Sequence, residues 1–194
     1  MPHELLVDYT TRDATRETRI IDLDEFENLF RTFKYTTWRL ETRRRYASDE
    51  TTDTYRQFME NGSAHWDFDG PYCIMIRAQT EQGKRVERVR ITDEPPTPGQ
   101  LYLLDNAKRN AALGEDIRNL RRAEAVRLGL PEEDFWIFDS RLVARLNFDS
   151  DDHLVDVELI TEPAEVVRCS LVRDAAWHHA VPYEMFTAEV NALD

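Results

Sequence analysis

The chain has few cysteines and no long apolar run. Its two cysteines, Cys73 and Cys169, lie far apart and follow no CxxC or Cys/His spacing. This pattern excludes a disulfide framework and a zinc motif, and we expect two buried free thiols. No stretch is apolar enough to cross a bilayer, and the start "MPHELLVDYTTRDATRE" has no apolar core. The sequence therefore predicts a cytoplasmic globular protein.

Basic charge is also scarce, since 25 Lys and Arg face 38 Asp and Glu, for a net charge of −13. Duplex binding needs many phosphate contacts from a basic surface, so this balance argues against broad nucleic-acid affinity. Three short stretches are nevertheless basic: "RLETRRRY" (39–46), "GKRVERVR" (83–90) and "IRNLRR" (117–122). Such stretches either bind an anion or pair with the surplus carboxylates, and both interpretations stay open.

Hydrophobic periodicity outlines the secondary structure. Helical spacing begins at Asp22 in "DLDEFENLFRTF", and further helices are expected over 49–60, 71–82 and 101–114. Alternating residues predict strands over 36–46 and 85–92, and a short strand around Ile117. The stretch "FWIFDSRLVARLNFDSDDHLVDVELI" (135–160) predicts three strands joined by tight turns. A last helix follows, with Thr161 as its expected N-cap and Pro163 in its first turn. One stripe of this helix, at spacings of three and four, contains Ala164, Val167, Leu171, Asp174 and His178.

This order of elements predicts an α+β fold of mixed α/β layers, with helices packed on a mixed sheet. We expect residues 1–20 to be peripheral or poorly ordered. Residues 21–83 form a helix-strand-helix part and residues 84–194 an α/β part. At 194 residues and 41% hydrophobic content, the two are expected to build one compact unit.

The strongest candidate site is a row of arginines that alternates with apolar residues. Guanidinium groups in a row suit phosphate or carboxylate, because each offers a planar fork of donors. If the strand 85–92 lies beside 36–46, the arginines of the two strands converge. The simpler alternative is a salt-bridged sheet face. The candidate anion-binding residues are Arg39, Glu41, Arg43, Arg45, Arg88 and Arg90.

Two further candidates are Asp139 and His178. Asp139 follows a hydrophobic strand and could end a ligand pocket, but Asp-Ser before a strand more often forms a turn. His178 and His179 diverge by about 100° on a helix, which disfavours joint metal ligation. We expect His178 to be buried or paired. The acidic "DSDDH" (149–153) lacks the glycine and the glutamate of a calcium loop, so we expect a hairpin turn.

Catalytic motifs are missing. The sequence has no GxSxG, no P-loop and no GxGxxG. Acidic neighbours such as Glu115 and Asp116 arise easily by chance in so acidic a chain. The sequence therefore predicts no metal and no cofactor, and it favours a protein that is not an enzyme.

Several segments resemble a family of actinobacterial proteins of unknown function. They are "LFRTFKYTTWRLETRRRY", "RVERVRITDEPP", "DFWIFDSRLVARLNFD" and "RDAAWHHAVPYEMF". The resemblance covers about residues 22–186. Genes of that family often lie near helix-turn-helix regulators of the XRE type, so the resemblance implies a regulatory context and no assigned activity.

Residues 85–181 are also similar to phospholipase D-like half-domains, in the order of elements, the "FWIFDSRLVARL" hairpin and the closing "LVRDAAWHHA" helix. Active members carry a His-x-Lys pair followed by Asp, in which histidine attacks phosphorus and lysine stabilises phosphate charge. None of the five histidines here has lysine at the second following position. The resemblance implies a degenerate half-domain without its chemistry.

These observations together predict a non-enzymatic regulatory or interaction protein. Its acidic surface would bind a helix-turn-helix regulator or an effector, without direct contact to nucleic acid or membrane. The alternative is an enzyme or sensor that acts on a phosphorylated or other anionic small molecule at an arginine-lined pocket.

Overall fold

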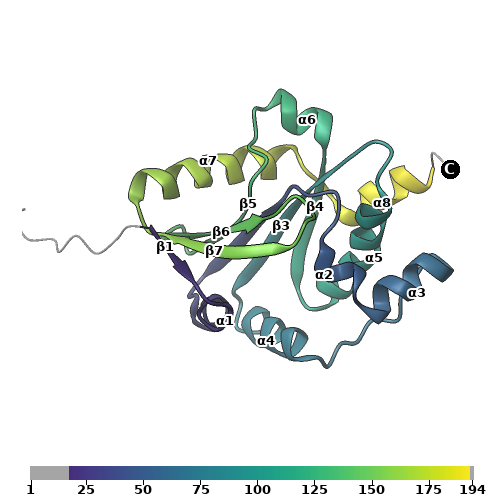
Figure 1. Ribbon diagram of the computed structural model, residues 1–194, viewed down its shortest axis with the longest axis horizontal. Helices are drawn as coiled ribbons and strands as arrows, with labels where there is room; N and C mark the ends of the chain where they lie inside the picture. Colours follow the sequence, from purple (N-terminus) through teal and green to yellow (C-terminus); the bar gives the residue numbers. More distant parts are fainter. Residues whose placement is uncertain (1–17, 193–194) are drawn as a thin grey trace, which may run out of the picture.

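The computed structural model describes residues 18–192. These residues build an eight-stranded mixed sheet with the order β1-β7-β6-β5-β2-β3-β4-β8 (Figure 1). Its strands are β1 (Thr18–Ile21), β2 (Thr36–Glu41), β3 (Arg85–Thr92), β4 (Glu115–Arg121), β5 (Asp134–Phe138), β6 (Leu142–Phe148), β7 (Leu154–Ile160) and β8 (Val181–Pro182).

The middle of the sheet joins sequence segments that lie far apart. Strands β2, β3 and β4 are parallel to one another, whereas β5 is antiparallel to β2. Parallel neighbours need long crossovers, and helices supply both of them here. The expected hairpins of 135–160 are present as β5, β6 and β7. Strand β2, from the N-terminal part, lies between two strands of the later part.

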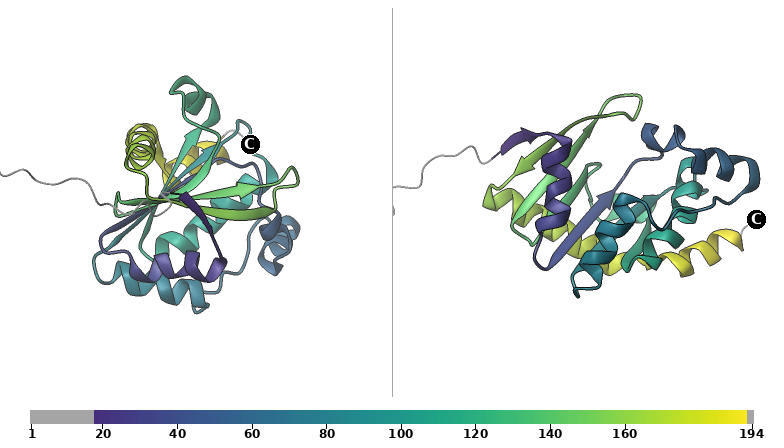
Figure 2. Two further views of the ribbon diagram at one scale, coloured as in Figure 1. Left: turned by 60° about the vertical axis from the view of Figure 1, so that its left-hand side comes forward. Right: turned by 90° about the horizontal axis from the view of Figure 1, so that it is seen from below.

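Helices cover both faces of the sheet (Figures 1 and 2). One face carries α7 (Pro163–His179) and the other carries α1, α4 and α5. The remaining helices are short or lie at the rim. Their bounds are α1 (Leu23–Thr32), α2 (Ala47–Glu50), α3 (Asp53–Asn61), α4 (Pro71–Thr80), α5 (Pro98–Ala112), α6 (Arg122–Arg127) and α8 (Tyr183–Asn191). The mixed α/β class expected from the sequence is thus the one observed.

Each central strand contributes side chains to two separate hydrophobic cores, because successive side chains point to opposite faces of the sheet. Trp38 and Leu40 of β2 pack beneath α7, together with Val89 of β3. The opposite core contains Phe30 and Trp136 and lies against α1 and α4. Both cysteines are buried and free, as expected.

Helix α5 begins where local sequence favours a start. Thr97 and Gln100 form a reciprocal capping box, and Pro98 occupies the first turn. Gly99 allows the helix to approach the chain after β2, since a Cβ there would lie 2.7 Å from the carbonyl oxygen of Arg44. The start of α5 is thereby fixed beside the end of β2.

Several local predictions need correction. The expected helix 49–60 is two helices, α2 and α3, and the helix expected over 71–82 ends at Thr80. The N-cap of α7 is Glu162 and not Thr161, because the Glu162 carboxylate accepts the N–H groups of Ala164 and Glu165. Strand β8 and helix α8 were not expected.

The prediction of which face of α7 packs against the sheet is also wrong. Val167 and Leu171 lie on the predicted stripe but are exposed, whereas Val166, Cys169 and Ala176 are buried. The helix carries apolar residues on more than one side, so its periodicity alone does not choose the packed face.

Residues 1–17 of the expected peripheral segment lie outside the described residues, and Thr18–Ile21 form the edge strand β1. Within residues 18–192, we find no helix that combines the length and the apolar character needed to cross a membrane.

Candidate functional site

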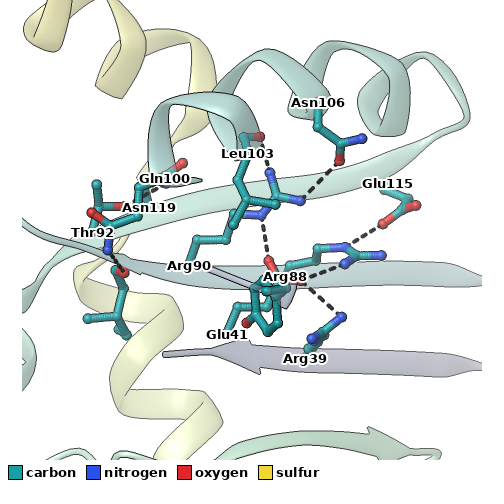
Figure 3. Close-up of polar contacts among 12 residues, drawn as sticks. Arg39, Glu41, Arg88, Arg90, Thr92, Gln100, Leu103, Asn106, Glu115 and Asn119 are labelled. Carbon is teal, nitrogen blue, oxygen red and sulfur yellow. Dashed lines mark hydrogen bonds and ion pairs between the residues drawn. The ribbon is translucent and has the colours of Figure 1, made fainter. Parts of the chain in front are cut away.

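The register of two parallel strands brings four of the predicted site residues together. Arg39 of β2 lies beside Arg88 of β3, and Glu41 lies beside Arg90. All four side chains point to the face that carries α4 and α5, where Figure 3 shows them joined by ion pairs. The condition set by the sequence, that the two strands be neighbours, is therefore met.

Glu41 is the centre of this cluster. Its Oε1 accepts from Arg88 Nη1 at 2.8 Å and lies 3.0 Å from Arg39 Nη1, while its Oε2 accepts from Arg90 Nε at 2.5 Å. Glu115 of β4 accepts a further bond from Arg88 Nε at 2.8 Å. We call Arg39, Glu41, Arg88, Arg90 and Glu115 the central cluster.

Burial and charge oppose each other at Glu41. Burial by itself would raise the pKa of the carboxyl group, but the guanidinium groups of Arg39, Arg90 and Arg88 outweigh it and hold the pKa well below its ordinary 4.5. Glu41 is therefore an ionised structural anion. It does not act as a proton donor at neutral pH.

Two tyrosines form hydrogen bonds at the edges of the central cluster, one with Glu115 and the other with Asp134, which pairs with Arg39. The hydroxyl of Tyr72 donates to Glu115 Oε1 at 2.8 Å and accepts from Arg88 Nη2 at 2.7 Å. That of Tyr46 donates to Asp134 Oδ2 at 2.5 Å. Burial raises the pKa of both tyrosines, and the nearby carboxylates Glu115 and Asp134 raise it further. Both hydroxyls stay protonated and serve as donors.

A cleft of about 500 Å³ lies over the central cluster. The right-hand view of Figure 2 shows the elements that frame it: α1 on one side, the β6–β7 hairpin and α2–α3 on another, and α4 and α5 on the third. Its size falls in the range of small-molecule sites. Arg39, Arg88 and Arg90 are part of its lining.

Arg109 of α5 also lines the cleft, and it differs from the other arginines. Its guanidinium lies 4.9 Å from the ring centre of Trp66. Its Nε is buried without a hydrogen-bond partner, as is that of Arg39, but within residues 18–192 no carboxylate pairs with Arg109, whereas Arg39 pairs with Glu41 and Asp134. The next residue, Asn110, is 2% exposed, and its Oδ1 likewise lacks a donor. Sequence reasoning missed both residues.

Asp49 of α2 is a second group that the sequence did not reveal. It lines the same cleft. Burial, and then the negative charge of Glu41, raise its pKa from 3.8 to about 6. The cleft therefore gains a negative charge as the pH rises through that value.

Arg43 and Arg45 do not belong to the arginine row that we predicted. Strand β2 ends at Glu41, and both arginines lie in the following connection. Arg43 Nε donates to Asp152 Oδ1 at 2.6 Å and Arg45 Nε donates to Asp152 Oδ2 at 2.9 Å. They bind the β6–β7 turn, and neither is part of the cleft lining.

Asp139 lies in the β5–β6 turn and is not part of the cleft lining. Its carboxylate accepts the backbone N–H groups of Lys34, Tyr35 and Thr36 at 2.8, 2.8 and 3.1 Å. Asp139 and Ser140 both have positive φ, 53° and 50°. The N–H of Arg141 donates to the carbonyl oxygen of Phe138 at 3.0 Å, so these residues form a tight β-turn and the contacts of Asp139 are those of the turn interpretation.

His178 is exposed, which excludes the first of the two expected states, a buried side chain. Its ring contacts that of His179, with centroids 5.0 Å apart. It lines a second cavity beside α7, together with Arg85 and Arg173. The structure thus places Asp139 and His178 away from the central cluster.

The cleft holds few groups suited to covalent chemistry. Its lining includes the hydroxyls of Ser48, Thr52 and Thr54 but no histidine and no cysteine. Glu41 and the neighbouring Glu115 are already bound by arginines, which leaves Asp49 as the lining carboxylate that no arginine of the described residues binds. Among residues 18–192, no group of three or more His, Cys, Asp or Glu side chains could hold a metal ion. The arrangement suits binding of a charged group.

Comparison with known proteins places this chain in a family. Residues 24–188 match the family described as "Domain of unknown function (DUF6879)". The chain belongs to that family. No curated protein matches it.

Several solved structures share parts of the arrangement. Nuc from Salmonella typhimurium, a phospholipase D family member, is 14% identical, with 80% of this chain and 86% of that chain covered and a TM-score of 0.47. NucT from Helicobacter pylori is 8% identical, with 85% and 98% covered and a TM-score of 0.47. The archaeal chromatin protein TrmBL2 is 9% identical; 89% of this chain spans 56% of that one, with a TM-score of 0.43. With TM-scores below 0.5, these likenesses carry no argument about the site.

Proposed function

We propose that this protein is a non-enzymatic binding module whose cleft accepts an anionic small molecule. The observation that carries the proposal is Arg109, an arginine in the cleft lining without a carboxylate partner among the described residues. A buried donor without a partner costs free energy, and an anion supplies that partner.

The charges around the cleft support this proposal. The positive charges of Arg39, Arg88 and Arg90 are matched by three carboxylates, Glu41, Glu115 and Asp134. Arg109 adds a positive charge and forms no ion pair within residues 18–192. Of the carboxylates that line the cleft, Glu27 pairs with Arg31 and Glu41 with the central arginines, which leaves Asp49. Below a pH of about 6, where Asp49 is protonated, the cleft has a surplus positive charge.

Inorganic sulfate is a suitable probe, because its charge is constant across this pH range. We expect millimolar sulfate, added at constant ionic strength and pH 5.5, to raise the melting temperature of the protein. Arg109→Met should abolish the rise. Arg118→Met is the matched control, because Arg118 lies 3.8 Å from the ring centre of Trp177 but does not line the cleft. An equal rise in all three proteins would overturn the proposal.

A regulatory role is a second proposal, supported by the distribution of charge. The net charge is −13, and three of the arginines that reduce it are buried or nearly so in the central cluster. Because three carboxylates, Glu41, Glu115 and Asp134, are buried with them, the excess of acidic residues lies outside this cluster. We propose that the acidic surface docks on the basic face of a helix-turn-helix regulator in the cytoplasm, within the actinobacterial gene context that the sequence resemblance implies.

A pull-down of the regulator encoded beside the gene tests the docking. We expect capture at low salt that weakens at high salt, because screening reduces attraction between exposed charges. No capture at either salt concentration would remove this role and leave the anion site untouched.

A further inference from the structure

The two ends of the cleft differ in chemistry. The end formed by α5 is polar and includes Asn106, Arg109 and Asn110. The end formed by α1 and the β6–β7 hairpin is mostly apolar and is lined by Phe26, Phe30, Leu146, Phe148 and Leu154, with the Glu27–Arg31 ion pair of α1 beside them. A small inorganic ion would fill only the first end, and a purely apolar ligand only the second.

The apolar end presents ring surface to the cleft. Phe30 is buried against Trp136, with the ring centres 4.7 Å apart, and Phe26 packs edge-on against Phe30 at 5.3 Å. Phe26 and Phe148 are only half-buried. Covering their exposed ring surface would remove apolar area from water, and aromatic ligands add favourable ring contacts.

The floor between the two ends also suits an aromatic ring. The guanidinium carbons of Arg39 and Arg88 lie 5.5 and 5.0 Å from the ring centre of Trp136. Both arginines line the cleft, and guanidinium groups stack on aromatic rings. A ring at this position would lie between the apolar end and Arg109.

The two cleft residues with unpartnered polar atoms, Arg109 and Asn110, indicate the chemistry of the polar half of the ligand. Arg109 needs an acceptor, and a carboxylate or phosphate matches its fork of donors. The Oδ1 atom of Asn110 is buried at the same end and needs a donor, which a hydroxyl group supplies.

We infer that the ligand is an aromatic acid, in which a ring that lies between the side chains of the α1 end and Arg109 carries a carboxylate or phosphate that binds Arg109. This inference rests on the proposed anion site and adds the class of molecule. A polymer is a poor fit, because the cavity is of small-molecule size and the net charge of −13 repels polyanions.

Calorimetric titration at pH 6 with four probes tests this inference. The aromatic acids are phenyl phosphate and phenylacetate, and their ring-free partners are inorganic phosphate and acetate. We expect each aromatic acid to bind at least about tenfold more tightly than its partner, which is the effect of about 1.4 kcal/mol of buried ring surface. The preferred head group, phosphate or carboxylate, then identifies the source of the charge.

Two variants separate the two ends. Phe26→Ala should remove most of the advantage of the aromatic acids, while Phe26→Leu should keep part of it. Leu23→Ala, on the same helix but 61% exposed and outside the cleft lining, is the matched control and should change nothing. Arg109→Met should reduce binding of all four probes. Circular dichroism of each variant checks that it is folded.

The possible failures are distinct. If aromatic acids bind no better than phosphate and acetate, or if Phe26→Ala has no effect in a folded protein, the inference is wrong and the anion site stands. If Arg109→Met leaves every affinity unchanged, the proposed function itself fails. Binding of neutral benzyl alcohol as tightly as phenylacetate would also overturn the charged half of the inference.

Discussion

Arg88 and Arg109 line the same cleft, yet their surroundings are opposite. Arg88 bonds to Glu41, Glu115 and Tyr72, and its side chain is 7% exposed. Arg109 rests on Trp66 and, among the described residues, has no carboxylate partner. The first arginine completes a buried network, and the second is available to a ligand. A row of arginines is therefore not a binding site by itself, because their partners decide which of them is free.

The largest expected effect comes from making one substitution at both positions. Arg88→Met leaves Glu41 and Glu115 buried without their shared cation, and breaking a buried pair in this way costs about 3–5 kcal/mol of unfolding free energy. Arg109→Met removes an unpaired charge and one ring contact, so the change should stay below about 1 kcal/mol. Denaturant titration measures both. Equal losses would show that Arg109 is as structural as Arg88.

Acid should weaken the central cluster selectively. The pKa of Glu41 is held below its ordinary 4.5, so its ionised form contributes stability that is present above that pH and is lost as the pH falls below it. We expect a loss of at most about 2 kcal/mol between pH 5 and pH 3 that depends on Glu41. Glu41→Gln should be less stable at pH 7 and should have a shallower acid slope. Parallel slopes in both proteins would contradict this assignment.

A smaller effect is expected at Arg43, outside the cleft. Its ion pair with Asp152 and its contact with Phe148 are partly exposed, and such pairs contribute at most about 1 kcal/mol. Arg43→Met should therefore lower the free energy of unfolding slightly and leave sulfate binding unchanged. Loss of sulfate binding in this variant would extend the site to the connection after β2.

The smallest expected effect is the pH dependence of sulfate binding at Arg109. Ionisation of Asp49, with a pKa of about 6, places a negative charge in the cleft. Sulfate affinity should fall a few-fold from pH 5.5 to pH 7.5, because like charges repel. Asp49→Asn should remove this dependence and hold the affinity near its low-pH value. An unchanged pH profile in that variant would assign the dependence to another group.

The alternation of side chains along the strands correctly predicted which residues of the central cluster share one face of the sheet. Because successive side chains of a strand point to opposite faces, Arg39 and Glu41 had to share one face and Trp38 and Leu40 the other. The same rule failed for Arg43 and Arg45, since alternation in the sequence continues past the end of the strand. The end is set by Asp134, whose carboxylate accepts the N–H and the hydroxyl of Thr42 at 2.8 and 2.7 Å.

The alternation of residues in the sequence could not identify Arg109 and Asn110 as part of the cleft. They lie in a helix with alternating polar and apolar residues, where an arginine is usually a solvated side chain. Only the packing of α5 under the sheet turns them toward the cleft. His178 shows the reverse case, because the stripe on which it lies faces solvent once Val166, Cys169 and Ala176 take the sheet side of α7.

The sequence by itself determined the mixed α/β class, the two-faced central strands and the lack of familiar catalytic motifs, since these depend on residue type and local period. The tertiary structure alone decided which arginines of the cleft are neutralised and that Arg109 has no carboxylate partner among the described residues. Neutralisation requires contact between groups such as Glu41 and Arg88, 47 positions apart, and Coulomb attraction depends on their distance in space rather than in the chain.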